Sequence, residues 1–136
     1  MAMNDPKPVP VIDPDSAPYW QALQEDRLIL KSCGDCGQAH FYPRELCPHC
    51  HSDNLGWIDA SGAGEVYSYT VCHRPAGPAF AQDVPYVVAI IALDEGPRMM
   101  SRIAADPTTV SIGRRVKVRF ERQSDTLTLP MFDFAE

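Results

Sequence analysis

A short amphipathic helix is the first element that the pattern of apolar and polar residues predicts. Ser16 and Pro18 suit a helix start, because serine favours the N-cap and proline lacks only an N–H that needs no partner there. The apolar positions that follow fall on one helical face: Tyr19, Trp20 and Leu23. The pattern predicts about three turns, ending near Arg27. A helix this small is not stable alone, so Trp20 must pack either in the chain's own core or against a partner subunit.

Two short apolar runs predict a small ribbon after the helix. Residues 28–30 are expected to form one strand, and Phe41 with Tyr42 the strand that returns beside it. Such a ribbon is too short to bury a hydrophobic core of its own. Most of its folding free energy must therefore come from a metal ion bound by the four cysteines that lie within it, Cys33, Cys36, Cys47 and Cys50.

From Trp57 onward the pattern is that of a β-protein. Five strands are expected, covering residues 65–73, 86–93, 98–104, 115–121 and 126–132. Alternation in the first strand places Tyr67 and Tyr69 on one face. Gly62 and Gly64 just before it suit a bulge or sharp bend, and the second strand is apolar enough to be buried on both faces. Five short antiparallel strands with a break between the third and fourth predict a small OB-fold barrel.

Length and composition fit one ordinary domain or two small ones. The 136 residues are 45% hydrophobic, enough for a packed core, and 13 prolines favour many turns over long helices. We expect a mainly β chain in three parts: a flexible tail at 1–15, the helix and zinc ribbon at 16–54, and the OB-fold domain at 55–136. The chain shows no signal peptide and no run of roughly 20 apolar residues, so no membrane partner and a cytoplasmic location are expected.

Two Cys-x-x-Cys pairs carry the clearest chemical signal: Cys33, Cys36, Cys47 and Cys50. Each pair places two thiolates on one tight turn, and two facing turns complete a tetrahedral sulfur site that suits Zn²⁺. Gly37 follows the first pair, where the backbone curls back beneath the metal. Four cysteines close the coordination shell, so the expected zinc is structural. His49 and His51 could in principle replace a cysteine, but we expect them to be surface residues.

Other uses of the cysteines fit the sequence less well. A disulfide framework needs an oxidising compartment, and a thioredoxin-like redox pair needs a βαβ context that the pattern does not show. Cys72, the remaining thiol, is followed by His73, but neighbours on a strand point to opposite faces and cannot form a catalytic dyad. We therefore expect Cys72 to be a small core residue and predict no catalytic residues in the chain.

The charge of the chain argues against a nucleic-acid function. Its formal net charge is −6, and a zinc tetrathiolate, with four thiolates at −4 and zinc at +2, would bring it to about −8. Affinity for nucleic acid comes mainly from Lys and Arg displacing counterions from phosphates. An OB-fold nucleic-acid-binding module that stacks bases on Tyr67 and Tyr69 is the alternative.

Several motifs, in the same order, resemble those of a bacterial and archaeal family. They are Pro18-Tyr19-Trp20, the two Cys-x-x-Cys pairs, Gly64-Glu65-Val66-Tyr67-Ser68-Tyr69-Thr70, Val84-Pro85-Tyr86-Val87-Val88-Ala89, Leu93-Asp94-Glu95-Gly96 and Ile112-Gly113. The family is that of the zinc-ribbon (rubredoxin-like) plus OB-fold accessory proteins of acyl-CoA metabolism, formerly a domain of unknown function. The resemblance covers residues 16–132.

The resemblance implies an accessory subunit that is not an enzyme by itself. Members of the family pair with thiolase-fold enzymes or with hot-dog-fold enoyl-CoA hydratases, and they help to hold an acyl-CoA or to stabilise the partner. Their assemblies carry out steroid side-chain retro-aldol cleavage, acetoacetyl-CoA chemistry or acyl transfer to aromatic polyketides. A hetero-oligomer is therefore expected, in which the catalytic Cys and His belong to the partner.

Five residues are candidates for contact with acyl-CoA or a partner: Trp20, Arg74, Phe80, Arg114 and Arg115. Phe80 lies at the centre of the longest loop, residues 74–85, and packs either against an acyl chain or partner or back over its own barrel. The arginines would bind CoA phosphates through bidentate hydrogen bonds. Lys117 and Arg119 are also basic, but we expect them to keep an exposed sheet face soluble.

Overall fold

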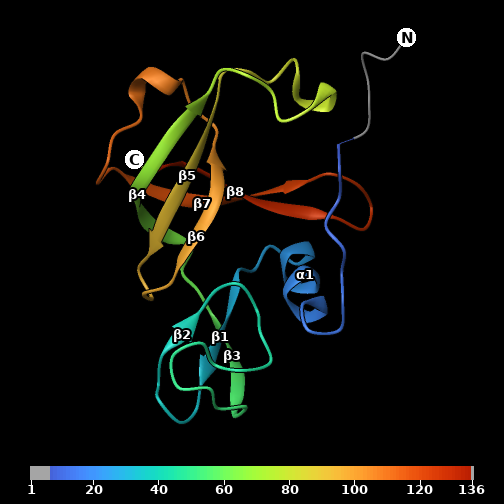
Figure 1. The fold of residues 1–136 in the computed structure, drawn as a ribbon, viewed down its shortest axis with the longest axis vertical. Helices are drawn as coiled ribbons and strands as arrows, with labels where there is room; N and C mark the ends of the chain where they lie inside the picture. Colours follow the sequence, from blue (N-terminus) through green and yellow to red (C-terminus); the bar gives the residue numbers. More distant parts are fainter. Residues whose placement is uncertain (1–6, 136) are drawn as a thin grey trace.

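A helix and a small ribbon form one end of the molecule, and a β-barrel forms the other (Figure 1). The computed structural model describes residues 7–135, so residues 1–6 of the predicted tail lie outside the described range. Within it, one α-helix, α1 (Ala17–Gln24), precedes eight strands and two 3-10 turns, η2 (Pro78–Phe80) and η3 (Pro107–Thr109). The predicted fold class, mainly β with a short N-terminal helix, a ribbon and a five-stranded OB-fold barrel, is confirmed. No helix in the described range is long and apolar enough to cross a membrane.

The helix α1 is shorter than the sequence pattern predicts. It ends at Gln24 and not near Arg27, because Asp26 adopts a left-handed φ of 59° that breaks the helical path. Ser16 is the N-cap residue, but its hydroxyl donates to a carboxylate upstream of the helix and does not cap it. The stripe predicted to be buried is buried, and Trp20 is only 8% exposed. The chain's own core therefore covers most of Trp20.

Three strands form the ribbon sheet in the order β2-β1-β3: β1 (Ile29–Cys33), β2 (Ala39–His40) and β3 (Leu55–Asp59). The return strand predicted at Phe41 and Tyr42 is wrong by two residues. These two side chains instead place their rings against Tyr19 of α1, each with its centroid 5.6 Å from the Tyr19 ring. β3, which the sequence pattern did not reveal, pairs along the whole of β1. The domain boundary between residues 54 and 55 stays a prediction.

Five strands close the barrel in the order β4-β5-β6-β8-β7: β4 (Ala63–Cys72), β5 (Tyr86–Leu93), β6 (Arg98–Ile103), β7 (Arg115–Arg122) and β8 (Thr128–Phe134). Their pairings are antiparallel, except that β6 and β8 meet in parallel at Ile103 and Phe132. β7 returns to pair with β4 and closes the ring. This closure, with the fifth strand between the third and the fourth, is the OB-fold arrangement.

A bulge in β4 decides which tyrosine faces the core. The register between β4 and β5 shifts between Val66 and Ser68. As a result Tyr67 is 50% exposed, whereas Tyr69 packs against the core. The prediction of a shared face is therefore wrong, because one extra residue in a bulge reverses the alternation. Gly64 lies before this bulge, where the backbones of β4 and β5 approach each other closely. A side chain would not fit there, because an added Cβ would lie 2.6 Å from a backbone oxygen of β5.

The barrel core is continuous with the face of α1. Val87 and Ile91 of β5 and Phe132 of β8 are fully buried, and one hydrophobic cluster joins them to Trp20 and Leu23. The residues of β5 that alternate with the buried ones are only half-buried. The predicted burial of β5 on both faces is therefore wrong for its outer face, which the rest of the chain covers only in part.

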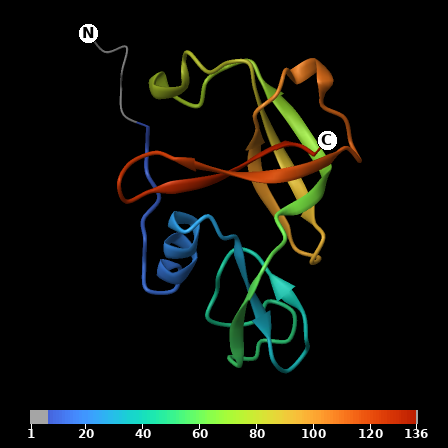
Figure 2. The ribbon, with the colours of Figure 1, turned by 180° about the vertical axis from the view of Figure 1, so that it is seen from behind.

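Polar contacts at the end of α1 hold the helix against the β7–β8 hairpin, which reaches past the barrel (Figure 2). The Gln24 side-chain amide donates to the backbone oxygen of Asp125 at 2.9 Å, and its oxygen accepts from the Thr128 hydroxyl. Thr128 is 1% exposed, so this contact is shielded from water. Because α1 also packs on β1, it joins the ribbon to the barrel.

Candidate functional site

Two tight turns of the ribbon bring four cysteine sulfurs together: Cys33, Cys36, Cys47 and Cys50. All four Sγ atoms lie within 4.8 Å of one another. The Sγ of Cys33 lies 3.6 Å from that of Cys50, and the Sγ of Cys36 lies 3.6 Å from that of Cys47. Zinc–sulfur bonds of about 2.3 Å in a tetrahedron give sulfur–sulfur edges of about 3.8 Å, so this spacing fits Zn²⁺.

Backbone N–H groups point at the sulfurs of Cys33 and Cys47, and at Cys33 they favour the thiolate form. Those of Cys36 and Asp35 donate to the Cys33 sulfur at 3.4 Å each, and they lower the pKa of this thiol to about 7. The N–H of His49 donates to the Cys47 sulfur at 3.3 Å. His49 and His51 are both exposed and lie outside the sulfur cluster, as the sequence predicts.

A carboxylate that sequence reasoning missed ties the ribbon loops together. Asp35, inside the first Cys-x-x-Cys pair, accepts hydrogen bonds from the Ser52 hydroxyl and from the Asn54 amide at 3.2 Å. These bonds lower the pKa of the Asp35 carboxyl. Gly34 also donates its N–H to the backbone oxygen of Asn54 at 2.7 Å. The side chains after the second pair thus fix the first pair, and sequence spacing gave no signal of this.

The structure places Arg114 and Arg115 at the start of β7, where each already has contacts. Arg115 makes a bidentate ion pair with Asp94, with N–O distances of 2.9 and 2.8 Å. Arg114 stacks on the Phe134 ring, 3.5 Å from its centroid, and donates to a backbone oxygen. The same surface of β7 carries Arg119, which pairs with carboxylates of β7 and β8.

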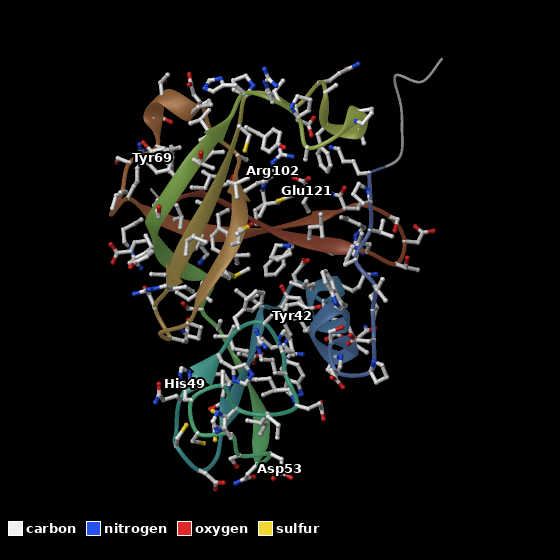
Figure 3. The ribbon with its side chains drawn as sticks, viewed as in Figure 1. Tyr42, His49, Asp53, Tyr69, Arg102 and Glu121 are labelled. Carbon is white, nitrogen blue, oxygen red and sulfur yellow. The ribbon has the colours of Figure 1, made fainter. Side chains whose placement is uncertain are left out.

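Trp20 and Phe80 line two neighbouring hollows on a different surface. A groove of about 440 Å³ runs between α1 and the outer face of the barrel, and we call it the methionine groove. Two of the residues that line it, Tyr42 and Arg102, are labelled in Figure 3. Its lining includes Trp20, Val88, Met99, Met100, Leu129 and Met131. Phe80 lines a neighbouring cavity that shares Leu129 and Met131 with the groove. Arg74 is exposed where β4 ends, and it lines neither hollow.

The Phe80 loop folds back toward its own barrel. The Phe80 ring lies 6.3 Å from that of Tyr86, between centroids, and Lys7 lies 5.4 Å from the Phe80 centroid. Of the two alternatives open at the sequence level, the described residues show packing over the barrel. The methionines were not among the predicted contacts, because their positions on β6 and β8 become neighbours only when the barrel closes.

Comparison with known proteins matches each half of the chain to a known domain family. Residues 20–56 match the family model described as "ChsH2, rubredoxin-like zinc ribbon domain", and residues 57–121 match "ChsH2, C-terminal OB-fold domain". The chain belongs to the ChsH2 (DUF35) family. A "DUF35 domain-containing scaffold protein" of Methanocaldococcus jannaschii is 40% identical over 106 residues, which are 76% of this chain and 74% of the relative. The family predicted from the motifs is confirmed.

Other relatives are enzyme subunits or parts of enzyme assemblies. A "Probable enoyl-CoA hydratase alpha subunit" of Thermomonospora curvata is 37% identical over 127 residues, 93% of this chain. The match spans only 39% of that relative's length. Among solved structures, "Ltp2-ChsH2(DUF35) aldolase" aligns with a TM-score of 0.83 and 36% identity, covering 94% of this chain and 100% of the matched chain.

The ribbon family and the sulfur cluster together establish the cofactor. A rubredoxin-like zinc ribbon with four clustered cysteines holds a structural Zn²⁺, as predicted. Zinc supplies a fixed cross-link between the two turns. The residues around it contribute the sulfurs, the N–H groups directed at them and the Asp35 bridge.

Proposed function

We propose that this chain is a non-catalytic accessory subunit that binds or positions an acyl-CoA and stabilises a thiolase-fold partner. The partner would be a thiolase, retro-aldolase or acyltransferase of lipid, steroid or polyketide-type acyl metabolism. The observation that supports this most is the similarity to a chain of the Ltp2-ChsH2(DUF35) aldolase, at 36% identity over the whole of that chain.

The chemistry of the chain supports an accessory role. We propose that Cys33, Cys36, Cys47 and Cys50 each bind the zinc, which leaves no coordination position for water or substrate. Cys72 is only half-buried at the end of β4, and His73 is exposed just beyond that strand, so neither is held in a buried site. The reactive groups would therefore come from the partner.

The methionine groove is the surface best suited to the partner. It is apolar, Met100 at its edge is 66% exposed, and flexible methionine side chains adapt well to a second apolar surface. The edge of Trp20 would contribute to the same contact. Acyl-CoA would lie along the loop that carries Arg74 and Phe80. A CoA phosphate bound at Arg114 and Arg115 would have to compete with Asp94, which already pairs with Arg115.

Affinity purification from the native host, followed by mass spectrometry, tests the proposal. A thiolase-fold enzyme should co-purify with the wild-type chain. Met100→Asp should remove that enzyme, because a charge in an apolar contact is costly to bury. Ile112→Asp is the matched control, since Ile112 is 69% exposed but lies away from the groove. A chain that purifies alone would overturn the proposal.

A hot-dog-fold enoyl-CoA hydratase is the second candidate partner. The relative from Thermomonospora curvata carries this module as 39% of a hydratase alpha subunit. A hydratase in place of a thiolase-fold enzyme among the co-purifying chains would select this candidate.

A nucleic-acid-binding role is less well supported. The chain is acidic, and the bulge in β4 separates the two tyrosines that would have stacked bases.

A further inference from the structure

A cavity of about 510 Å³ lies between the ribbon and the turn that joins β5 to β6. This turn and β2 lie side by side in both Figure 1 and Figure 2. Residues 37–41, which contain β2, and residues 95–98 of the turn supply most of the lining, together with Pro48 and His49. Ligand pockets in proteins typically measure about 300–1,000 Å³, so the cavity is large enough for a small molecule. It shares only Phe41 with the methionine groove.

Three buried side-chain atoms of the described residues have no hydrogen-bond partner, and all three belong to residues that line this cavity. They are the two ring nitrogens of His40 and the Oε1 of Glu95. His40 is only 4% exposed, and the other carboxylate oxygen of Glu95 already accepts from the Ser61 N–H at 2.8 Å. Buried polar atoms in native proteins nearly always have partners, so three such atoms at one cavity indicate a polar ligand.

The lining carries one charge of each sign. Arg98 lies over the Tyr67 ring, 3.8 Å from its centroid, and across residues 7–135 its guanidinium makes no hydrogen bond or ion pair. Glu95 has no cationic partner in the same range. Burial lowers the pKa of His40, and the charges of His49, Arg44 and Lys31 lower it further, so His40 is neutral near pH 7. One of its ring nitrogens then donates a hydrogen bond and the other accepts one.

The surrounding charges balance one another. Lys31 and Arg44 are the other cations that act on His40. The zinc tetrathiolate of the same ribbon offsets them, because four thiolates at −4 and zinc at +2 leave −2. Asp94, beside Glu95, is paired with Arg115. The site therefore offers an anion and a cation at no net charge, which favours a ligand that also carries one charge of each sign.

The rest of the lining is apolar and leaves space. Phe41, Pro48 and Pro97 contribute carbon surface. Gly37 and Gly96 add no side chain, and a Cβ built at either one would have no neighbour within 4 Å. An apolar group of a few carbons can therefore leave water here.

We propose that this cavity binds a free apolar α-amino acid as its zwitterion. The ammonium group donates to the Oε1 of Glu95, and the carboxylate accepts from Arg98 and from the ring N–H of His40. Two of the three unpartnered atoms thereby gain hydrogen bonds, and Arg98 offers the paired donors that a carboxylate prefers. The side chain packs against Phe41, Pro48 and Pro97. This site goes beyond the proposed function, since it needs neither a CoA moiety nor a partner subunit.

NMR titration of the zinc-loaded full chain with L-leucine tests the site. Leucine should cause saturable shifts of the amide signals of Ala39 and Gly96, which line the cavity. N-acetyl-leucine, which has no ammonium group, should bind at least about tenfold more weakly, and glycine should also bind more weakly because it buries no side chain. Glu95→Gln should weaken leucine binding by about tenfold, because the carboxylate charge is lost. Glu121→Gln is the matched control: Glu121 is also half-buried, but it pairs with Arg119 and lies outside the cavity.

The outcomes separate this site from the accessory role. No saturable shift with wild-type protein at about 10 mM leucine, equal affinity for N-acetyl-leucine, or equal leucine affinity in the two glutamate variants would overturn the inference. If the amide spectrum shows that Glu95→Gln does not fold, Arg98→Gln replaces it, because Arg98 is exposed and contributes the other charge. Co-purification of a partner enzyme together with a failure to bind leucine would leave the proposed function standing alone.

Discussion

Replacing Cys47 by serine should unfold the ribbon while the barrel stays folded. Cys47 is fully buried at the sulfur cluster, and serine is a poor zinc ligand. Between residues 34 and 54 the buried side chains are few: His40, Pro43 and Cys47. This stretch therefore has almost no hydrophobic core with which to compensate for lost metal.

The size of the effect follows from the metal. Structural zinc contributes an apparent binding free energy of about 10–16 kcal/mol in small zinc domains, as much as or more than the roughly 5–15 kcal/mol that stabilises a whole domain. The barrel has its own core, with Val66, Ile91 and Phe132 fully buried, so it should retain its structure. Loss of one ligand is thus expected to unfold the ribbon selectively.

Metal analysis and fluorescence provide the assay. Purified wild-type protein should contain about one zinc ion per chain, and Cys47→Ser much less. Trp57 lies in β3 and is half-buried against the hydrophobic core, so its emission should shift to the red when the ribbon opens. Cys72→Ser, outside the cluster, is the control and should keep its zinc. Full zinc content and unchanged emission in Cys47→Ser would refute the reasoning.

Three further predictions concern the barrel. Gly64→Ala should destabilise the barrel, because the new Cβ would lie 2.6 Å from a backbone oxygen. Gly56→Ala is the control and should not be destabilising, because its new Cβ would have no neighbour within 4 Å. Equal denaturation midpoints for the two variants would contradict this. Phe132→Ala should cost about 3–5 kcal/mol of unfolding free energy, measured in urea. Hydrogen bonds from Arg115 lower the pKa of Asp94 below its ordinary 3.8, so the pair stabilises the fold above that pH and loses its effect as the pH falls through the folded-state pKa. Melting temperatures of wild type and Asp94→Asn should therefore differ near about pH 6 and converge in acid; a constant difference would contradict this.

Local chemistry made the metal site predictable. Two Cys-x-x-Cys pairs determine their own turns, because each pair needs only a few residues of backbone to aim both sulfurs at one point. The barrel strands were also visible, since alternation of apolar residues depends on neighbours in the sequence. Both led to the correct fold class and, through the motifs, to the correct family.

Features that depend on contacts between distant residues were decided only by the tertiary structure. Phe41 and Tyr42 pack their rings on Tyr19, so the return strand lies two residues earlier than predicted, and a bulge turned Tyr67 outward. The partners of Arg115 and the groove around Met100 arise where separate strands meet. Spacing along one segment carries no information about the segment that packs against it. The sequence by itself therefore determined the cluster of four cysteines and the type of fold, whereas packing between strands decided which surfaces are left to bind something else.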